Sequence, residues 1–240
     1  MKNRVVILFL TALVFTACDR SVTGYWEKHG TDISDISAAE DVFAVFAEKA
    51  VAGPEEEAVA EIDRLFDMLK ADTVAYFVYG EWSASAFYSL LSPCRSCSLF
   101  THAVDRMEGD GVIDDGSTLQ RYLRLRNICR YNRVGDSLTL PLLYDRDFKP
   151  VVIAGPARQS LFLVLDLGCP SCMEAIDKAY SIAPAALKYA LVFGPPPIPN
   201  LPGWEVYRFR DPESLIDFDA APYYFIAGPD GKIQTGYTKI

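Results

Sequence analysis

The residues of this sequence best suited to chemistry are two Cys-x-x-Cys pairs, Cys94 with Cys97 and Cys169 with Cys172. In such a pair one thiolate attacks a disulfide, and the second cysteine then attacks the first to resolve the mixed disulfide. The same spacing also suits a structural disulfide or half of a zinc site. Zinc would need two more ligands, and the two pairs lie too far apart for zinc-ribbon spacing. We therefore expect no metal.

The second pair lies where the apolar segment from Ser160 to Leu167 gives way to a helical pattern over Pro170 to Ala183. A continuous apolar run is typical of a strand buried on both faces. Cys169 would then cap the helix, where free amide groups and the helix dipole stabilise a thiolate. Pro170 would occupy the first turn, where its missing N–H costs nothing. This context favours redox chemistry over a structural disulfide.

The N-terminus has the pattern of an export signal. Lys2 and Arg4 form a positive region, and Val5 to Phe15 is an apolar run too short to span a membrane. The tetrad Phe15-Thr16-Ala17-Cys18 resembles the lipobox of bacterial lipoproteins, which implies lipidation of Cys18. We expect residues 1–17 to be a signal peptide and the protein to be anchored by lipid, facing the periplasm or the cell surface. The alternative is an ordinary cleaved signal with a chance cysteine.

Export bears on the first pair, because thiols that meet an oxidising compartment tend to form disulfides. Two interpretations stay open for Cys94 and Cys97, which also precede a helical pattern. The compartment favours a structural disulfide between them, and the alternative is a second dithiol that relays electrons to Cys169 and Cys172. Cys129 lies on an apolar helical face, which predicts a buried, unpaired thiol.

The remaining chain divides into a tether, a helical domain and an α/β domain. Residues 18–37 are polar with little periodicity, which is typical of a tether. Helical periods and Gly/Pro breaks recur over residues 38–133 and predict a small all-α domain. From residue 134 to residue 240 the order is a hairpin, a strand, the Pro170 helix, two strands, a short helix over Pro212 to Phe218 and a terminal hairpin. That order is typical of an α/β domain.

Composition narrows the partners. Half of the residues are hydrophobic and 12% are aromatic, so the chain can bury a core. The formal net charge is −9 and no basic run is present, which excludes an electrostatic footprint for nucleic acid. Membrane attachment is therefore expected through the lipid and not through charge.

Residues Leu161 to Cys172, the Ala221-Pro222 pair and the Tyr223–Lys232 hairpin together resemble the thioredoxin-like superfamily, in its branch of membrane-anchored periplasmic thiol–disulfide oxidoreductases. The resemblance covers residues 134–240. It implies a mixed central sheet with flanking helices and a terminal hairpin. It also implies a cis-proline that faces the dithiol and presents the substrate strand, a role that falls on Pro222 with Ala221 before it.

The sequence departs from this family at three points. Gly168 replaces the tryptophan that precedes the first active cysteine, and the usual buried acid falls at Leu163. Asp166 is a different position, and we expect its charge to raise the pKa of Cys169. The family's C-terminal helix is missing after the last hairpin, so we expect one face of the sheet to be less covered.

The function predicted from these residues is that of a lipid-anchored, extracytoplasmic thiol–disulfide oxidoreductase. Cys169 and Cys172 would be catalytic, with Pro170 and Ser171 as the active-site loop. Electrons would reside in the dithiol, so no dissociable cofactor is expected. The partners would be protein thiols or disulfides and a redox partner protein. The alternative is a non-catalytic surface lipoprotein whose degenerate thioredoxin-like scaffold binds a partner.

Overall fold

The computed structural model describes residues 21–113, 116–153, 157–195 and 197–240. The chain divides into two compact units, one ending at Leu123 and one beginning at Arg124. The boundary falls within helix α7 (Gly116–Ile128), upstream of residue 134, where sequence analysis starts the second domain. Each unit is described by itself.

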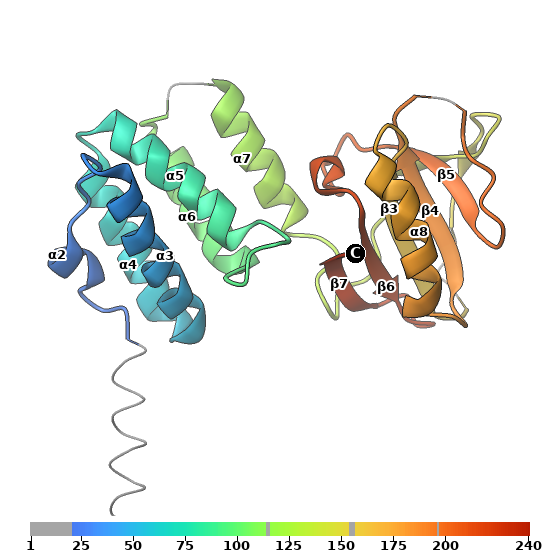
Figure 1. The fold of residues 1–240 in the computed structure, drawn as a ribbon, viewed down its shortest axis with the longest axis horizontal. Helices are drawn as coiled ribbons and strands as arrows, with labels where there is room; N and C mark the ends of the chain where they lie inside the picture. The colour runs from blue at the N-terminus through green and yellow to red at the C-terminus, as the bar shows by residue number, and fades with distance from the viewer. Residues whose placement is uncertain (1–20, 114–115, 154–156, 196) are drawn as a thin grey trace, which may run out of the picture. The chain divides into compact units, whose positions relative to one another are not determined.

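The first unit is helical (Figure 1). Besides α7 its helices are α2 Tyr25–His29, α3 Ile36–Ala52, α4 Glu55–Leu69, α5 Thr73–Phe87 and α6 Cys97–Asp110. Side chains at the preceding positions explain where three of them begin. Asp35, Asp72 and Ser96 each accept a backbone N–H from the first turn of α3, α5 and α6, respectively. The apolar faces of these helices then pack into an aromatic core.

Part of the segment predicted as a tether is folded into this unit. Tyr25 and Trp26 of α2 are buried, and Trp26 packs edge-on against Tyr79 of α5 with ring centroids 5.6 Å apart. The backbone N–H groups of Gly24 and Trp26 donate to the Glu61 carboxylate at 2.8 and 3.4 Å. The tether prediction is therefore wrong for α2, because its aromatic rings find a place in the helical core.

The second unit is built on one mixed sheet of order β2-β1-β5-β4-β3-β6-β7. The strands are β1 Leu142–Tyr144, β2 Pro150–Val151, β3 Ser160–Asp166, β4 Leu187–Phe193, β5 Glu205–Arg210, β6 Tyr223–Ala227 and β7 Ile233–Lys239. Strand β4 pairs in parallel with β3 and β5, whereas β1, β2, β6 and β7 pair antiparallel with their neighbours. Both predicted hairpins are present, the one at the start of the α/β domain as β1–β2 and the one at its end as β6–β7.

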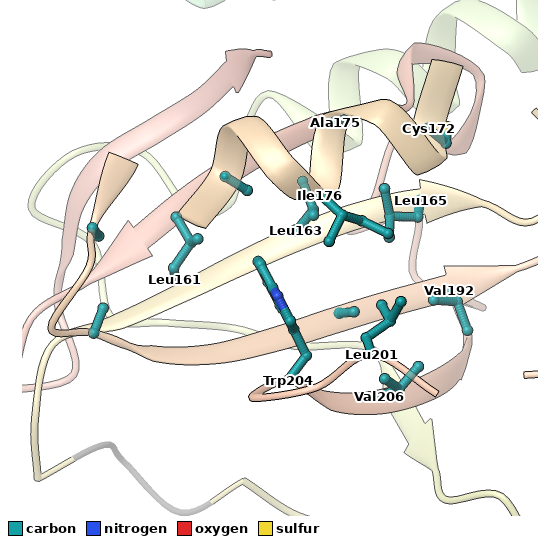
Figure 2. Packing of buried hydrophobic residues seen from close by; sticks show 14 of the residues in the cluster. Leu161, Leu163, Leu165, Cys172, Ala175, Ile176, Val192, Leu201, Trp204 and Val206 are labelled. Carbon is teal, nitrogen blue, oxygen red and sulfur yellow. The ribbon is translucent and has the colours of Figure 1, made fainter. Parts of the chain in front are cut away.

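Helix α8 (Pro170–Ile182) covers one face of the sheet (Figure 1). Because side chains alternate along a strand, Leu161, Leu163 and Leu165 of β3 share this face. They form one buried cluster with residues of α8 and of β4. Figure 2 shows Leu163, Leu165 and Ile176 between the helix and the sheet. This packing fixes the start of α8 against the end of β3.

The other face carries a row of aromatic rings and is also buried. Phe162 stacks on Tyr189 and on Phe225, each with ring centroids 5.0 Å apart, and Phe162 and Phe225 are fully buried. The segment before β6 is bonded to this face, since the Tyr237 hydroxyl donates to the Leu215 carbonyl at 2.6 Å. The centre of this face is therefore buried, while Phe193 of β4 and Phe209 of β5 remain partly exposed.

The same segment is not the helix predicted over Pro212 to Phe218. The Asp211 carboxylate accepts the backbone N–H groups of Leu215 and Ile216 at 2.8 and 2.7 Å. A side chain that binds backbone amides in this way competes with helix formation. The regular element found is the short 3₁₀ turn η1 (Phe218–Ala220).

Candidate active site

The pair Cys169 and Cys172 lies at the connection between β3 and α8. Strand β3 ends at Asp166, and Cys169 has an extended backbone at the N-cap of α8, with Pro170 in the first turn. The Cys169 N–H donates to the Asp166 carbonyl at 3.2 Å, and the Cys172 N–H donates to the Cys169 carbonyl at 3.1 Å. The strand-to-helix placement predicted for this pair is confirmed. Both cysteines carry free thiols.

The two thiols differ in exposure and in acidity. Cys169 is partly exposed, and the Ser171 hydroxyl lies 3.0 Å from its sulfur. That hydrogen bond, helped by groups of Cys172, lowers the pKa of Cys169. Cys172 is fully buried, and burial raises its pKa to about 11. Near neutral pH the exposed sulfur is therefore the better nucleophile, and the buried sulfur stays protonated.

The effect predicted for Asp166 is wrong in its target. The pKa of Cys169 is lowered, and the Asp166 charge acts on Cys172 instead, where it adds to the upward shift in pKa that burial causes. Asp166 ends β3 next to Cys172, and its backbone N–H donates to the Cys172 sulfur at 3.4 Å; this hydrogen bond lowers the Cys172 pKa and opposes the rise that burial causes. Leu163, at the position of the family's buried acid, is fully buried in the apolar cluster.

The loop before β6 completes the site. The Ala221–Pro222 peptide bond is cis. Ala221 and Cys169 both pack against the buried cluster under α8, so the loop and the dithiol border the same core. The Lys239 amine in β7 donates to the carbonyls of Ala220 and Ala221 at 2.7 and 3.3 Å. Sequence reasoning missed Lys239, because its position depends on the β6–β7 register that places it opposite Tyr223.

The Cys94 pair has a different arrangement. Cys94 is a free, buried thiol, whereas Cys97 and Cys129 are disulfide-bonded. The structural disulfide predicted between Cys94 and Cys97 is therefore wrong, and so is the unpaired Cys129. The physical reason lies in the turn before α6, where Ser96 is the N-cap and Cys94, two residues earlier, buries its side chain in the helical core.

The buried thiol of Cys94 is poorly suited to nucleophilic attack. Burial raises the pKa of Cys94, and the Glu48 charge raises it further. The Ser171 hydroxyl stabilises the thiolate of Cys169. Within the described residues, no hydroxyl or amide is found that stabilises the thiolate of Cys94 in this way. Of the two pairs, only Cys169 and Cys172 therefore include an accessible thiol whose pKa is lowered.

Comparison with known proteins agrees with this architecture. No protein-family model and no curated protein matches the chain. A solved structure of a thioredoxin-like protein from Bacteroides caccae ATCC 43185 superposes with a TM-score of 0.67 at 15% sequence identity, over 90% of this chain and 86% of that one. A likeness at this identity defines the fold, and the chain has a thioredoxin-like fold with a helical unit before it.

The predicted signal peptide, residues 1–17, and the predicted lipidation site, Cys18, lie outside the described residues. Along the described part of the chain, every helix is too short or too polar to cross a bilayer. The same residues contain no group of three or more side chains placed to hold a metal ion.

Proposed function

We propose that the protein is a thiol–disulfide oxidoreductase that acts on protein substrates through Cys169 and Cys172. The observation that carries the proposal is the contrast within the dithiol. Cys169 is accessible and acidic, and Cys172 is buried with a pKa raised to about 11. A dithiol of this kind contains one attacking group and one resolving group.

In the reducing direction, the Cys169 thiolate attacks one sulfur of a substrate disulfide. A mixed disulfide forms, and the other substrate sulfur leaves as a thiolate that takes up a proton. Cys172 then loses its proton and attacks the Cys169 sulfur, which releases the second substrate thiolate and leaves a Cys169–Cys172 disulfide. A redox partner protein restores the dithiol by the same exchange. The oxidising direction is the reverse of these steps.

In this proposal the loop at Pro222 binds the substrate, as the thioredoxin-like fold suggests. Ala221 and the start of β6 lie beside the same core as Cys169, and Lys239 holds the carbonyls of Ala220 and Ala221 in place. An extended substrate segment carrying a cysteine would lie along this loop, with its sulfur next to Cys169.

The test is the reduction of insulin by dithiothreitol with the purified chain as catalyst. We expect the native protein to accelerate the precipitation of the insulin B chain and Cys169→Ser to be inactive. Cys94→Ala, which removes a thiol in the other pair, is the matched control and should keep full activity. Equal activity of Cys169→Ser and the native protein would overturn the proposal.

The cellular part of the proposal is membrane anchoring by a lipid on Cys18, with the protein facing the periplasm or the cell surface. Its support is the apolar run and the Phe15-Thr16-Ala17-Cys18 tetrad. Metabolic labelling with a fatty acid should mark the native protein and not Cys18→Ser. A native protein without label would contradict the anchor and leave the dithiol proposal to its own test.

A second candidate function is a non-catalytic binding module on the same scaffold. The observations that favour it are Gly168 at the position of the family's tryptophan and apolar Leu163 at that of its buried acid. Iodoacetamide distinguishes the two candidates. A mildly reduced protein whose Cys169 does not react at neutral pH supports the binding module and contradicts the enzyme.

A further inference from the structure

Asp166 is bonded to the turn between β3 and α8 through its side chain and through both of its backbone groups. Its carboxylate oxygen Oδ1 accepts the Gly168 N–H at 2.8 Å. Its backbone N–H lies 3.4 Å from the Cys172 sulfur, and its carbonyl accepts the Cys169 N–H at 3.2 Å. One residue therefore contacts the backbone before the exposed cysteine and the sulfur of the buried one.

The carboxylate lies close to the backbone of Gly194, which directly follows β4. Gly194 has a positive φ of 101°, and a Cβ added there would lie 3.0 Å from Asp166 Oδ1 and 3.4 Å from the Leu167 nitrogen. Only glycine allows this close approach. The Arg208 guanidinium, on the neighbouring strand β5, donates to the Gly194 carbonyl at 2.9 Å and so ties Gly194 to the sheet.

The charge of the carboxylate bears on the same reaction step. Burial is the main cause of the raised Cys172 pKa, and the Asp166 backbone N–H opposes it. Cys169 and the negative charge of Asp166 add to the upward shift. By contrast, the pKa of Cys169 is lowered by Ser171 and Cys172, which lie within α8. The two steps of the exchange therefore depend on different neighbours.

We infer that Asp166, packed close to Gly194, is a positioning residue for the resolving step, in which Cys172 attacks the mixed disulfide on Cys169. This inference rests on the proposed function and deepens it. The carboxylate fixes the turn so that the two sulfurs meet, and its charge opposes the loss of the Cys172 proton. The first attack, by Cys169, does not depend on it.

Ellman's reagent, an aromatic disulfide, separates the two steps in one experiment. Cys169 attacks it and releases one coloured thiolate, and Cys172 then attacks Cys169 and releases the second. Stopped-flow absorbance of the reduced protein follows both phases as a function of pH. A background carrying Cys18→Ser and Cys94→Ala, with the Cys97 and Cys129 disulfide left oxidised, ensures that the coloured product comes from the dithiol.

Asp166→Ala and Asp166→Asn divide the two effects of the carboxylate. Alanine removes the acceptor for the Gly168 N–H, so we expect the plateau rate of the second phase to fall by about tenfold, the equivalent of one hydrogen bond. Asparagine keeps an oxygen acceptor and loses the charge. We expect it to retain the plateau rate and to move the pH profile of the second phase to lower pH. The first phase should stay within about twofold of native in both variants.

Glycine substitutions give an independent check with a matched control. Gly194→Ala places a Cβ against Asp166 and should slow the second phase as Asp166→Ala does. Gly203→Ala also meets a positive φ, of 75°, but has no atom within 4 Å of its new Cβ. It also places alanine at a positive φ but without the contact, so its second phase should match that of the native protein.

The outcomes are distinct. An Asp166→Asn plateau rate as low as that of Asp166→Ala, or a native plateau rate in Asp166→Ala, would overturn the positioning role. Equal losses in Gly194→Ala and Gly203→Ala would overturn the part assigned to Gly194. Circular dichroism and thermal melting confirm that each variant is folded. If the native protein releases no second thiolate, the proposed function fails before the inference is reached.

Discussion

The pairs Cys94–Cys97 and Cys169–Cys172 each precede a helix, and each has a serine directly before its second cysteine. In the Cys169 pair the first cysteine is itself the N-cap, and Ser171 bonds to its sulfur. In the Cys94 pair the serine, Ser96, is the N-cap and accepts the Leu99 N–H. The same residue types are therefore displaced by two positions relative to the helix.

That displacement decides the chemistry of each pair. A cysteine at the N-cap lies among free amide groups and next to solvent, so its thiolate is stabilised and accessible. Cys94 lies two residues before the cap, inside the helical core, and burial raises the pKa of its thiol. Cys97 is the first residue of α6 and is disulfide-bonded. A Cys-x-x-Cys spacing near a helix is thus not by itself a redox centre.

The largest expected effect separates the pairs by activity. Cys169→Ser should lower the rate of insulin reduction by at least about a hundredfold, because a serine hydroxyl is not ionised near neutral pH. Cys97→Ser should leave the rate within about twofold, since its sulfur has no part in the exchange. A loss of activity in Cys97→Ser with the fold intact would show instead that both cysteine pairs take part in one electron relay.

The next effect is on stability, where we expect Cys97→Ser to have the larger effect and Cys169→Ser the smaller one. Cys97→Ser removes a disulfide and should lower the free energy of unfolding by about 2–4 kcal/mol. Cys169→Ser changes a partly exposed thiol and should cost less than about 0.5 kcal/mol. Urea denaturation under non-reducing conditions measures both. Equal costs for the two variants would contradict the structural role given to Cys97.

The pH dependence of alkylation should order three thiols. Cys169, whose pKa is lowered, reacts fully above that pKa and loses reactivity as the pH falls through it. Cys94 and Cys172, whose pKa values are raised by burial, stay protonated until the pH exceeds the pKa of an ordinary thiol. At pH 7 we expect Cys169 to react at least about tenfold faster than either. Mass spectrometry of iodoacetamide-labelled peptides gives the three profiles, and a Cys94 profile like that of Cys169 would refute the assignment.

The smallest effect tests the two serines. Ser171→Ala removes the hydroxyl that stabilises the Cys169 thiolate, so alkylation of Cys169 at neutral pH should slow by about two- to fivefold. Ser96→Ala removes a helix cap and should instead cost about 1 kcal/mol of stability with no change at Cys169. An unchanged alkylation rate in Ser171→Ala would show that the helix terminus alone lowers the pKa of Cys169.

Local patterns were enough to predict most elements of this protein. Ser160 to Leu167 is apolar at nearly every position because β3 is buried on both faces, and Pro170 starts α8 because its ring fits a first turn. These are properties of neighbouring residues, so they are visible in the chain itself. The strand-to-helix placement of Cys169 and Cys172 was therefore predictable without a structure.

Tertiary structure decided what joins distant residues. Cys97 takes part in a disulfide and Cys94 is a free thiol, although the oxidising compartment favoured a bond between these two. The contact of Gly194 with Asp166 likewise joins the ends of two neighbouring strands. Hydrophobic periodicity reports which face of an element is buried, but it does not report which side chain lies opposite. The sequence by itself determined where the dithiol stands in the chain, and the fold determined which thiols are free, which is acidic and which residues hold them.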